Sequence, residues 1–359
     1  MKYNNKFRGD IILNLKRNKL LLGAAIIFLI SIILLAIFRT SIFKTDENNN
    51  NYAKNSKLNT TKPSTEEYVW ISCIAHQSMF VNHDHKALIQ FGKDQKVKVS
   101  IEGPDEYDVI KQAEIIRQVI KRKPAGIMIL GMEQSLVVAV NEAVDAGIPT
   151  ITVDADLPQS KRMAYVGSDW FKIGQKQGEA IVKLIGGKGQ VAVMGIGGAA
   201  NMQQGFEGFK SVIKNYPDII YIGEFDDMAN IEESQRIAED LLKKYPDIAA
   251  ISGFDVNSGP GIGEAIKENK MVGKVKVTCV DIEPIHLKLC KEGVIQKLIG
   301  QKRELFTYYG ARLLYDYNHS TLALSYNDKK NNITPIPYIV DTGLIEVDKD
   351  NVDSFLAEK

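Results

Sequence analysis

Acidic, amide-bearing and aromatic side chains follow several short apolar runs of this chain. Asp154 and Asp281 each end such a run, and Asp255 follows a third run directly after Phe254. Carboxylates accept hydrogen bonds from hydroxyl groups, and an aromatic face covers the apolar side of a ring-shaped molecule. Because open parallel sheets bind ligands outside the carboxyl ends of their strands, these residues are candidates for one shared binding site.

These candidates also have a purely structural interpretation. An aspartate at the end of a strand often only caps the next turn, and this alternative stays open for Asp154 and Asp281. Met79 and Phe80, which follow the first apolar run, are also typical of the core-facing side of a helix.

A glycine pattern suggests a second kind of site. Gly195-x-Gly197-x-x-Ala200 matches the dinucleotide fingerprint at a predicted turn from strand to helix. The fingerprint needs an acidic partner about 20 residues later, and Asp226 and Asp227 come somewhat late for it. Nucleotide binding is therefore the weaker alternative.

Motifs for catalysis and metal binding are absent from the sequence. There is no His-Glu-x-x-His, Gly-x-Ser-x-Gly, phosphate loop or Cys-x-x-Cys, and His83 and His85 do not share a helix face. Three scattered cysteines make no disulfide framework, and a net charge of +1 leaves no global attraction for nucleic acid. We expect binding without catalysis, and no cofactor, metal or nucleic acid.

The elements that must position these residues follow from the hydrophobic pattern after Tyr68. Short β-branched runs alternate with amphipathic stretches, which predicts parallel sheets with helices on both faces. The series breaks after about Val166, where a predicted helix over 170–185 starts a second set, so we predict two similar doubly wound α/β domains. The predicted strands are Val69–Ala75, Val97–Glu102, Gly126–Leu130, Thr150–Asp154, Gln190–Gly195, Ile219–Phe225, Ala249–Phe254 and Val275–Asp281.

An uncharged run from Leu20 to Phe38 precedes the folded region. As a helix it spans roughly 28 Å, close to the hydrocarbon core of a bilayer. Lys16, Arg17 and Lys19 precede it, which keeps residues 1–19 in the cytoplasm and the rest outside the cell. We predict a transmembrane helix over 20–38, with a cleaved signal peptide as the alternative; a buried core helix fits poorly because no face is polar.

Residues 39–67 are a polar tract rich in Asn, Lys, Ser and Thr. Such a tract buries too little apolar surface to order itself, so we predict a flexible linker. Its root-mean-square reach of roughly 30 Å keeps the folded region near the outer face of the membrane.

The stretch from Tyr68 to about Glu346 resembles the type I periplasmic sugar-binding proteins, which include ribose-, xylose- and galactose-binding receptors. The resemblance rests on four sequence motifs whose order and spacing make it specific: Gly147–Asp154, Val166–Asp169, Gly205–Phe209 and Val280–Asp281. It implies two domains, joined by a hinge of three crossovers, that close on a monosaccharide. The implied ranges are 68–168 with about 302–330 for the first domain, and 169–301 with about 331–346 for the second.

The same resemblance implies the sugar-binding residues. They are Gln77, Met79, Phe80, Asp154, Asp156, Trp170, Gln203, Phe254, Asp255, Asp281 and Gln301. Ala155 and Gln203 stand where the family often has arginine, and Asp156 is included to compensate for Ala155. Phe254 stands where asparagine is frequent, so we expect it to stack on the sugar, and with Trp170 to narrow the pocket.

The membrane span makes the chain similar to membrane-anchored, xylose-sensing members that work with a membrane histidine kinase. We expect a non-enzymatic receptor in the cell membrane that closes on a pentose such as D-xylose and signals to a kinase sensor domain. Delivery of sugar to an ABC permease is the alternative within the family. An enzyme acting on a carbohydrate or nucleotide is the alternative outside it.

Overall fold

The computed structural model describes residues 65–320, 322–328, 330–331 and 333–356. The predicted transmembrane helix over 20–38 and nearly all of the predicted linker over 39–67 lie outside these residues. Within the part that is described, no helix is long and apolar enough to cross a membrane. The elements below all belong to one compact unit, Pro63–Lys359.

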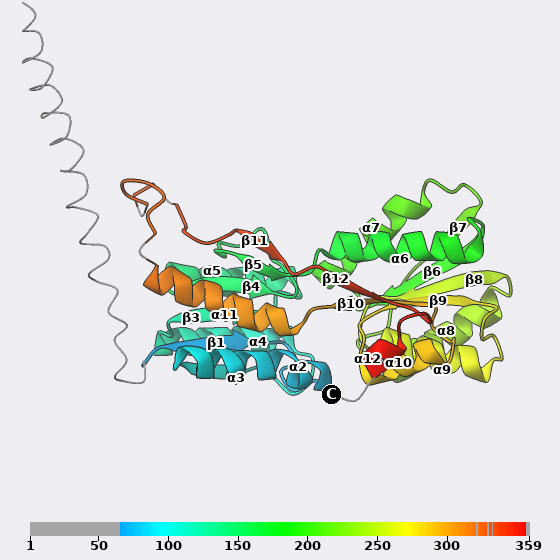
Figure 1. Cartoon of the computed structure of the whole chain (residues 1–359), viewed down its shortest axis with the longest axis horizontal. Helices are drawn as coiled ribbons and strands as arrows, with labels where there is room; N and C mark the ends of the chain where they lie inside the picture. Colours follow the sequence, from blue (N-terminus) through cyan, green and yellow to red (C-terminus); the bar gives the residue numbers. More distant parts are fainter. Residues whose placement is uncertain (1–64, 321, 329, 332, 357–359) are drawn as a thin grey trace, which may run out of the picture. The chain divides into compact units, whose positions relative to one another are not determined.

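The first α/β domain is built on a six-stranded parallel sheet in the order β11-β5-β4-β3-β1-β2. Its strands are β1 (Glu67–Ile71), β2 (Lys98–Glu102), β3 (Gly126–Ile129), β4 (Thr150–Val153), β5 (Tyr165–Gly167) and β11 (Ile339–Asp341). Helices cover both faces (Figure 1). One layer is α2 (Ser78–Asn82), α3 (Asp84–Gln95) and α11 (Glu304–His319); the other is α4 (Val109–Arg122), η1 (Gln134–Leu136) and α5 (Val137–Asp145).

The second α/β domain has a six-stranded sheet in the order β12-β10-β9-β8-β6-β7, parallel except for β12. Its strands are β6 (Gly189–Gly195), β7 (Ile219–Asp226), β8 (Ile248–Gly253), β9 (Lys276–Val280), β10 (Lys297–Gln301) and β12 (Leu344–Val347). Helices again form two layers (Figure 1). They are α6 (Trp170–Ile185) with α7 (Ala200–Ile213), and α8 (Ile231–Lys244), α9 (Ser258–Glu268), α10 (Pro284–Lys291) and α12 (Asp353–Leu356).

Every strand predicted from the sequence is present, with its ends displaced by a few residues. The additional strands are β5, β10, β11 and β12, and the last two keep most of their side chains partly exposed. Such strands carry little hydrophobic signal, and only their pairing with neighbours identifies them.

The chain passes between the two sheets three times. β5 leads into α6, β10 leads into α11, and β11 leads into β12. The resemblance assigns residues 331–346 as a whole to the second domain, and this assignment is wrong for β11. β11 pairs with β5 and extends the edge of the first sheet, while only β12 pairs with β10.

Alternating side chains of β6 fill two separate parts of the core. Val191 and Val193 belong to the cluster on the α6–α7 side, and Ala192 and Met194 belong to the cluster on the α8–α10 side. Successive side chains of a strand point to opposite faces, so a sheet covered on both sides needs a continuous apolar run. This explains the unbroken apolar pattern of the central strands.

Glycines let α6 and α7 pack with their backbones in contact. A Cβ atom at Gly174 would lie 1.8 Å from the carbonyl oxygen of Gly205, and one at Gly208 would lie 2.0 Å from that of Phe171. Any larger residue forces the two helices apart. The glycines of the Gly205–Phe209 motif therefore allow close helix packing in the second domain.

We predict that Gly208→Ala destabilises the protein by about 1–3 kcal/mol, because the new methyl group overpacks the α6–α7 contact. Urea unfolding monitored by circular dichroism measures the change. The control Lys172→Ala alters an exposed position of α6 and should shift the free energy of unfolding by less than about 0.5 kcal/mol. Equal effects of the two variants would contradict the packing argument.

Candidate functional site

A cavity lies between the two domains, at the carboxyl ends of strands from both sheets. It contains about 510 Å³ of space not filled by protein atoms, part of which is open to solvent. The predicted site residues that line it are Gln77, Met79, Phe80, Asp154, Trp170, Asp255, Asp281 and Gln301. The structure therefore brings most of the predicted set together around one space.

Asp154 and Asp281 occupy equivalent positions in the two domains. Each directly follows a strand, β4 or β9, and each donates its backbone N–H to the neighbouring strand, at Val166 or Ile299. Both have a left-handed backbone, with φ of +65° and +75°. Neither side chain caps a helix, so the turn-capping alternative does not hold. Backbone strain of this kind costs about 1–3 kcal/mol per residue and is typical of binding sites.

Arg303 supplies a buried cation beside the cavity. Its Nη2 donates to Asp154 Oδ2 at 2.8 Å and its Nε donates to Asp84 Oδ2 at 3.0 Å. The guanidinium also lies over the ring of Phe80, 5.0 Å from its centroid. Arg303 immediately precedes α11 on the second crossover, so it ties the hinge to α3 and β4 of the first domain.

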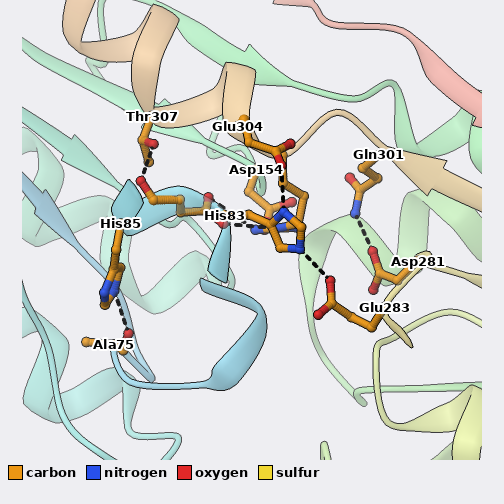
Figure 2. Close-up of polar contacts among 11 residues, drawn as sticks. Ala75, His83, His85, Asp154, Asp281, Glu283, Gln301, Glu304 and Thr307 are labelled. Atoms are coloured by element: carbon orange, nitrogen blue, oxygen red, sulfur yellow. Dashed lines mark hydrogen bonds and ion pairs between the residues drawn. The ribbon is translucent and has the colours of Figure 1, made fainter. Parts of the chain in front are cut away.

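Burial and charge together set the protonation of this cluster. Burial raises the pKa of Asp84 and of Asp281 to about 6, although the Arg303 cation acts in the opposite direction on both. Burial alone would lower the pKa of Arg303, but the carboxylates of Asp154 and Asp84 outweigh it and keep the guanidinium charged. Gln301 Nε2 lies 3.4 Å from Asp281 Oδ1, which links the same crossover to the second domain (Figure 2).

The two carboxylate oxygens of Asp255 have different surroundings. Its Oδ1 accepts the backbone N–H groups of Asn257 at 2.5 Å and Ser258 at 3.0 Å. Its Oδ2 is buried and receives no N–H or O–H from the described residues, and the Asp255 side chain instead hydrogen-bonds the carboxyl group of Asp227. Burial and the neighbouring carboxylate of Asp227 raise the pKa of Asp255 well above its ordinary value.

Three buried acceptor atoms of cavity-lining residues have no hydrogen-bond partner in the described structure. They are Asp154 Oδ1, Asn201 Oδ1 and Gln301 Oε1. An unsatisfied buried polar atom costs about 1–3 kcal/mol, so such atoms persist where a ligand can complete them. Because all three are acceptors, the matching ligand carries several O–H or N–H donors.

Aromatic and apolar side chains form the rest of the wall. Met79 and Phe80 pack in the core of the first domain and also line the cavity, so the structural and the functional interpretation both apply to them. Trp170 donates its Nε1–H to the carbonyl oxygen of Asp154 at 3.0 Å, which holds the indole in place. Flat apolar faces of this kind pack against the C–H faces of a ring.

Three predicted residues lie away from the cavity. Asp156 does not compensate for Ala155, because it pairs with the buried Arg162, whose Nη2 donates to Asp156 Oδ2 at 2.6 Å. Gln203 is exposed on α7. Phe254 is fully buried and makes an edge-to-face contact with Phe206 at 5.0 Å, so it does not stack on a ligand.

Sequence reasoning missed Arg303 and Asn201. Asn201 lies in the first turn of α7, and Gln203, two residues later, is about 200° away around the helix and points to solvent. Arg303 follows Gln301 at the end of β10, a strand without a strong hydrophobic signal. The polar pair Gln301 and Arg303 after the short apolar run of that strand is the signal that could have revealed it.

The glycine turn before α7 is occupied by protein acceptors. The Gly197 N–H donates to Asp226 Oδ1 at 2.8 Å, and the Ala200 N–H donates to the carbonyl oxygen of Met132 at 2.8 Å. A Cβ atom at Gly197 would lie 2.5 Å from Asp226 Oδ2. The glycine thus admits a carboxylate, whose charge opposes a phosphate, and this disfavours the nucleotide interpretation.

Comparisons with known proteins match the two-domain α/β fold. Residues 70–319 match the family model described as a periplasmic binding protein domain. A sugar-binding protein of a sugar ABC transporter from Bacillus halodurans is 28% identical, with a TM-score of 0.73, and covers 81% of this chain and 100% of its own. AraP, an arabinose binding protein from Geobacillus stearothermophilus, is 29% identical over 81% of this chain and 99% of its own, with a TM-score of 0.69. XylFII in the XylFII–LytSN complex is 25% identical over 80% and 99%, with a TM-score of 0.69.

We predict that Arg303→Met destabilises the protein by about 3–5 kcal/mol at pH 7.5, because buried carboxylates lose their counter-charge. Arg312→Met, which breaks an exposed pair with Asp316 on α11, should cost at most about 1 kcal/mol.

The loss of stability caused by Arg303→Met should depend on pH, and the carboxylates beside Arg303 determine the direction. In the wild type Asp84 and Asp281 have pKa values of about 6, and Arg303 holds both down. Without this cation both carboxylates take up protons at a higher pH, so fewer charges are left unpaired in the variant as the pH falls. The loss caused by Arg303→Met should therefore shrink between pH 7.5 and pH 5 in chemical denaturation. A loss that stays constant over this range would contradict the assigned ion cluster.

Proposed function

This chain belongs to the family of proteins with a periplasmic binding protein domain, and we propose that it is a receptor for a neutral monosaccharide. The observation that carries the proposal is the set of unpartnered acceptors around one cavity with aromatic walls. A sugar offers several hydroxyl donors in a ring and one apolar face. It can satisfy those acceptors while it packs against Phe80 and Trp170.

The charge around the cavity favours an uncharged ligand. Arg303 is the only Lys or Arg among the described residues that line the cavity, and Asp84 and Asp154 already neutralise it. Asp255 and Asp281 add further acidic groups. A sugar phosphate or a sugar acid would meet carboxylates without a free cation, which costs binding energy.

The preferred ligand in this proposal is a pentose such as D-xylose. The resemblance to xylose-sensing members supports it, as does AraP, which is named as an arabinose binding protein. Members of this family bind sugars without converting them, so the receptor is proposed to release its ligand unchanged.

The proposal extends to location and signalling. The uncharged run over 20–38 and the basic residues before it support a single-pass anchor with the binding domains outside the cell. The proposed partner is the sensor domain of a membrane histidine kinase. XylFII, a relative of similar fold, has been solved in a complex with a second protein, LytSN.

Delivery of sugar to an ABC permease is the second candidate function. It is favoured by the likeness to the Bacillus halodurans protein, which is described as the sugar-binding protein of a sugar ABC transporter. Both functions use the same closing of two domains on a sugar, and they differ only in the protein that reads the closed state.

A thermal melt of the full-length chain in detergent tests the ligand class. D-Xylose, L-arabinose or D-ribose should raise the Tm by roughly 5 °C at a hundredfold excess over Kd, whereas D-glucuronate and ribose 5-phosphate should not. The sugar recovered from the complex should be chemically unchanged. Stabilisation by the anionic sugars alone would refute a neutral ligand, and turnover of a bound sugar would refute a receptor.

A matched pair of variants tests the position of the site. Asp281→Asn removes a carboxylate acceptor and should weaken sugar binding about 10- to 100-fold in calorimetry. Gln203→Ala changes an exposed residue outside the cavity and should leave Kd within about twofold. The reverse order of effects would place the site elsewhere.

Purification of the tagged full-length chain from its native membranes after mild cross-linking identifies the partner. We expect a membrane histidine kinase to be retained, more strongly in the presence of the stabilising pentose, because the sugar favours the closed state that the partner recognises. Permease subunits in place of the kinase would establish the transport function instead.

A further inference from the structure

His83 joins the two domains at the rim of the cavity. It lies at the turn between α2 and α3 of the first domain. Its Nε2 is 2.7 Å from Oε1 of Glu283, which lies between β9 and α10 of the second domain. Its Nδ1 is 2.7 Å from Oε1 of Glu304, the first residue of α11. Figure 2 shows the imidazole between the two carboxylates.

Only a protonated imidazole can make both contacts as a donor. A neutral ring donates from one nitrogen and presents a lone pair from the other, which would face a carboxylate oxygen. The side chains of His83 and Glu283 are only 28% and 12% exposed, so water cannot fully replace either contact. The two contacts therefore favour an imidazolium between two carboxylates.

The surrounding charges agree with this charge state. The adjacent Asp84 is also acidic, and Arg303, directly before α11, acts on Glu283. Burial lowers the pKa of His286 on α10 to about 4, so this ring is neutral at pH 7 and above. Hydrogen bonds to Glu283 and Glu304 raise the pKa of His83 to about 9. Burial alone would raise the pKa of Glu283, but its bond to His83 outweighs burial and keeps that pKa below its ordinary value.

The two contacts of His83 differ in what opening of the cavity would do to them. Glu304 belongs to α11, which packs on α3 in the first domain, so its contact with His83 is retained when the domains separate. Glu283 belongs to the second domain and would be carried away. It lies two residues after Asp281, so the turn that carries it also carries a cavity-lining carboxylate.

We propose that His83 and Glu283 form a clasp that stabilises the closed arrangement of the two domains, with His83 as a positioning residue for the sugar site. Its role in sugar binding rests on the proposed function, but the closure itself does not. Another contact between the domains, from the Ala200 N–H to the Met132 carbonyl, is a backbone hydrogen bond without a titratable group. The clasp is thus a contact that charge substitution can remove.

Closure is measured in the ligand-free, full-length chain by double electron–electron resonance spectroscopy, which gives the distance between two spin labels. Spin labels are placed on cysteines introduced at the exposed Lys93 of α3 and Lys288 of α10, one in each domain. The native cysteines, Cys73, Cys279 and Cys290, are buried. The ratio of closed to open distances then reports the clasp without any sugar.

His83→Gln and Glu283→Gln should each lower the ratio of closed to open molecules about 5- to 30-fold at pH 7, since a half-buried charge-assisted bond is lost. The double variant should be no more open than either single variant.

His83 makes no side-chain cap to α3, so its replacement leaves the helix intact. His85→Gln is the matched control, because His85 bonds only the Ala75 carbonyl of its own domain, and it should leave the ratio unchanged.

The pH profile separates a charged clasp from a merely structural role. As pH rises from 7 to 10, the His83 imidazolium loses its proton near its closed-state pKa of about 9, so the closed fraction should fall. Burial lowers the pKa of His85, which therefore stays neutral over this range. His83→Arg keeps a cation at all these pH values and should restore closure and abolish the pH dependence.

Several results would overturn the clasp: unchanged distances in both glutamine variants, additive opening in the double variant, or a pH profile that persists in His83→Arg. A closed fraction of the wild type that does not fall between pH 7 and pH 10 would also overturn the clasp. If no sugar stabilises the chain but these distances respond as expected, the clasp stands and the sugar-receptor proposal fails. The reverse pattern, sugar binding with unresponsive distances, leaves the receptor and removes the clasp.

Discussion

The buried Arg303 is the constraint on which the site depends. A guanidinium without water must be neutralised, and Asp84 and Asp154 do this from two different elements of the first domain. Since Arg303 lies on a crossover, its ion pairs hold the hinge, the start of α3 and the end of β4 in one arrangement. Removal of the cation would leave buried carboxylates uncompensated.

The cavity follows from this arrangement. Asp154 and Asp281 end equivalent strands with left-handed backbones, and the crossover beside them contributes both Gln301 and Arg303. Their polar atoms are held by the fold before any ligand arrives, so a ligand meets acceptors that are already oriented. The stability given up to strain and unsatisfied acceptors is recovered when hydroxyl donors complete them. Apolar walls from both domains exclude water and strengthen those hydrogen bonds.

Charged side chains inside the cavity and at its rim together determine how readily the two domains close. Inside, Asp154 and Asp281 bring carboxylates from the two domains near one another, and the Arg303 cation offsets their repulsion. At the rim, His83 places a positive charge between carboxylates from both domains and favours closure. A ligand needs only to supply the remaining free energy to populate the closed state. The charge on one side chain at the rim can thereby set the affinity of a site that it does not touch.

The sequence by itself determined the α/β class, the principal strands and the acidic residues at their ends. Buried strands need apolar runs, and the first polar residue after such a run indicates where the strand ends. The family resemblance of the sequence also implied Gln77, Met79, Phe80, Asp154, Trp170, Asp255, Asp281 and Gln301, which the structure places around one cavity. Tertiary structure alone decided where side chains point: Phe254 packs inward, Gln203 faces solvent, and Asp156 neutralises Arg162. It also decided the role of Arg303 and His83, whose partners come from elements more than a hundred residues apart. Local patterns are set by backbone periodicity, whereas charge pairing is set by which distant elements the fold brings together.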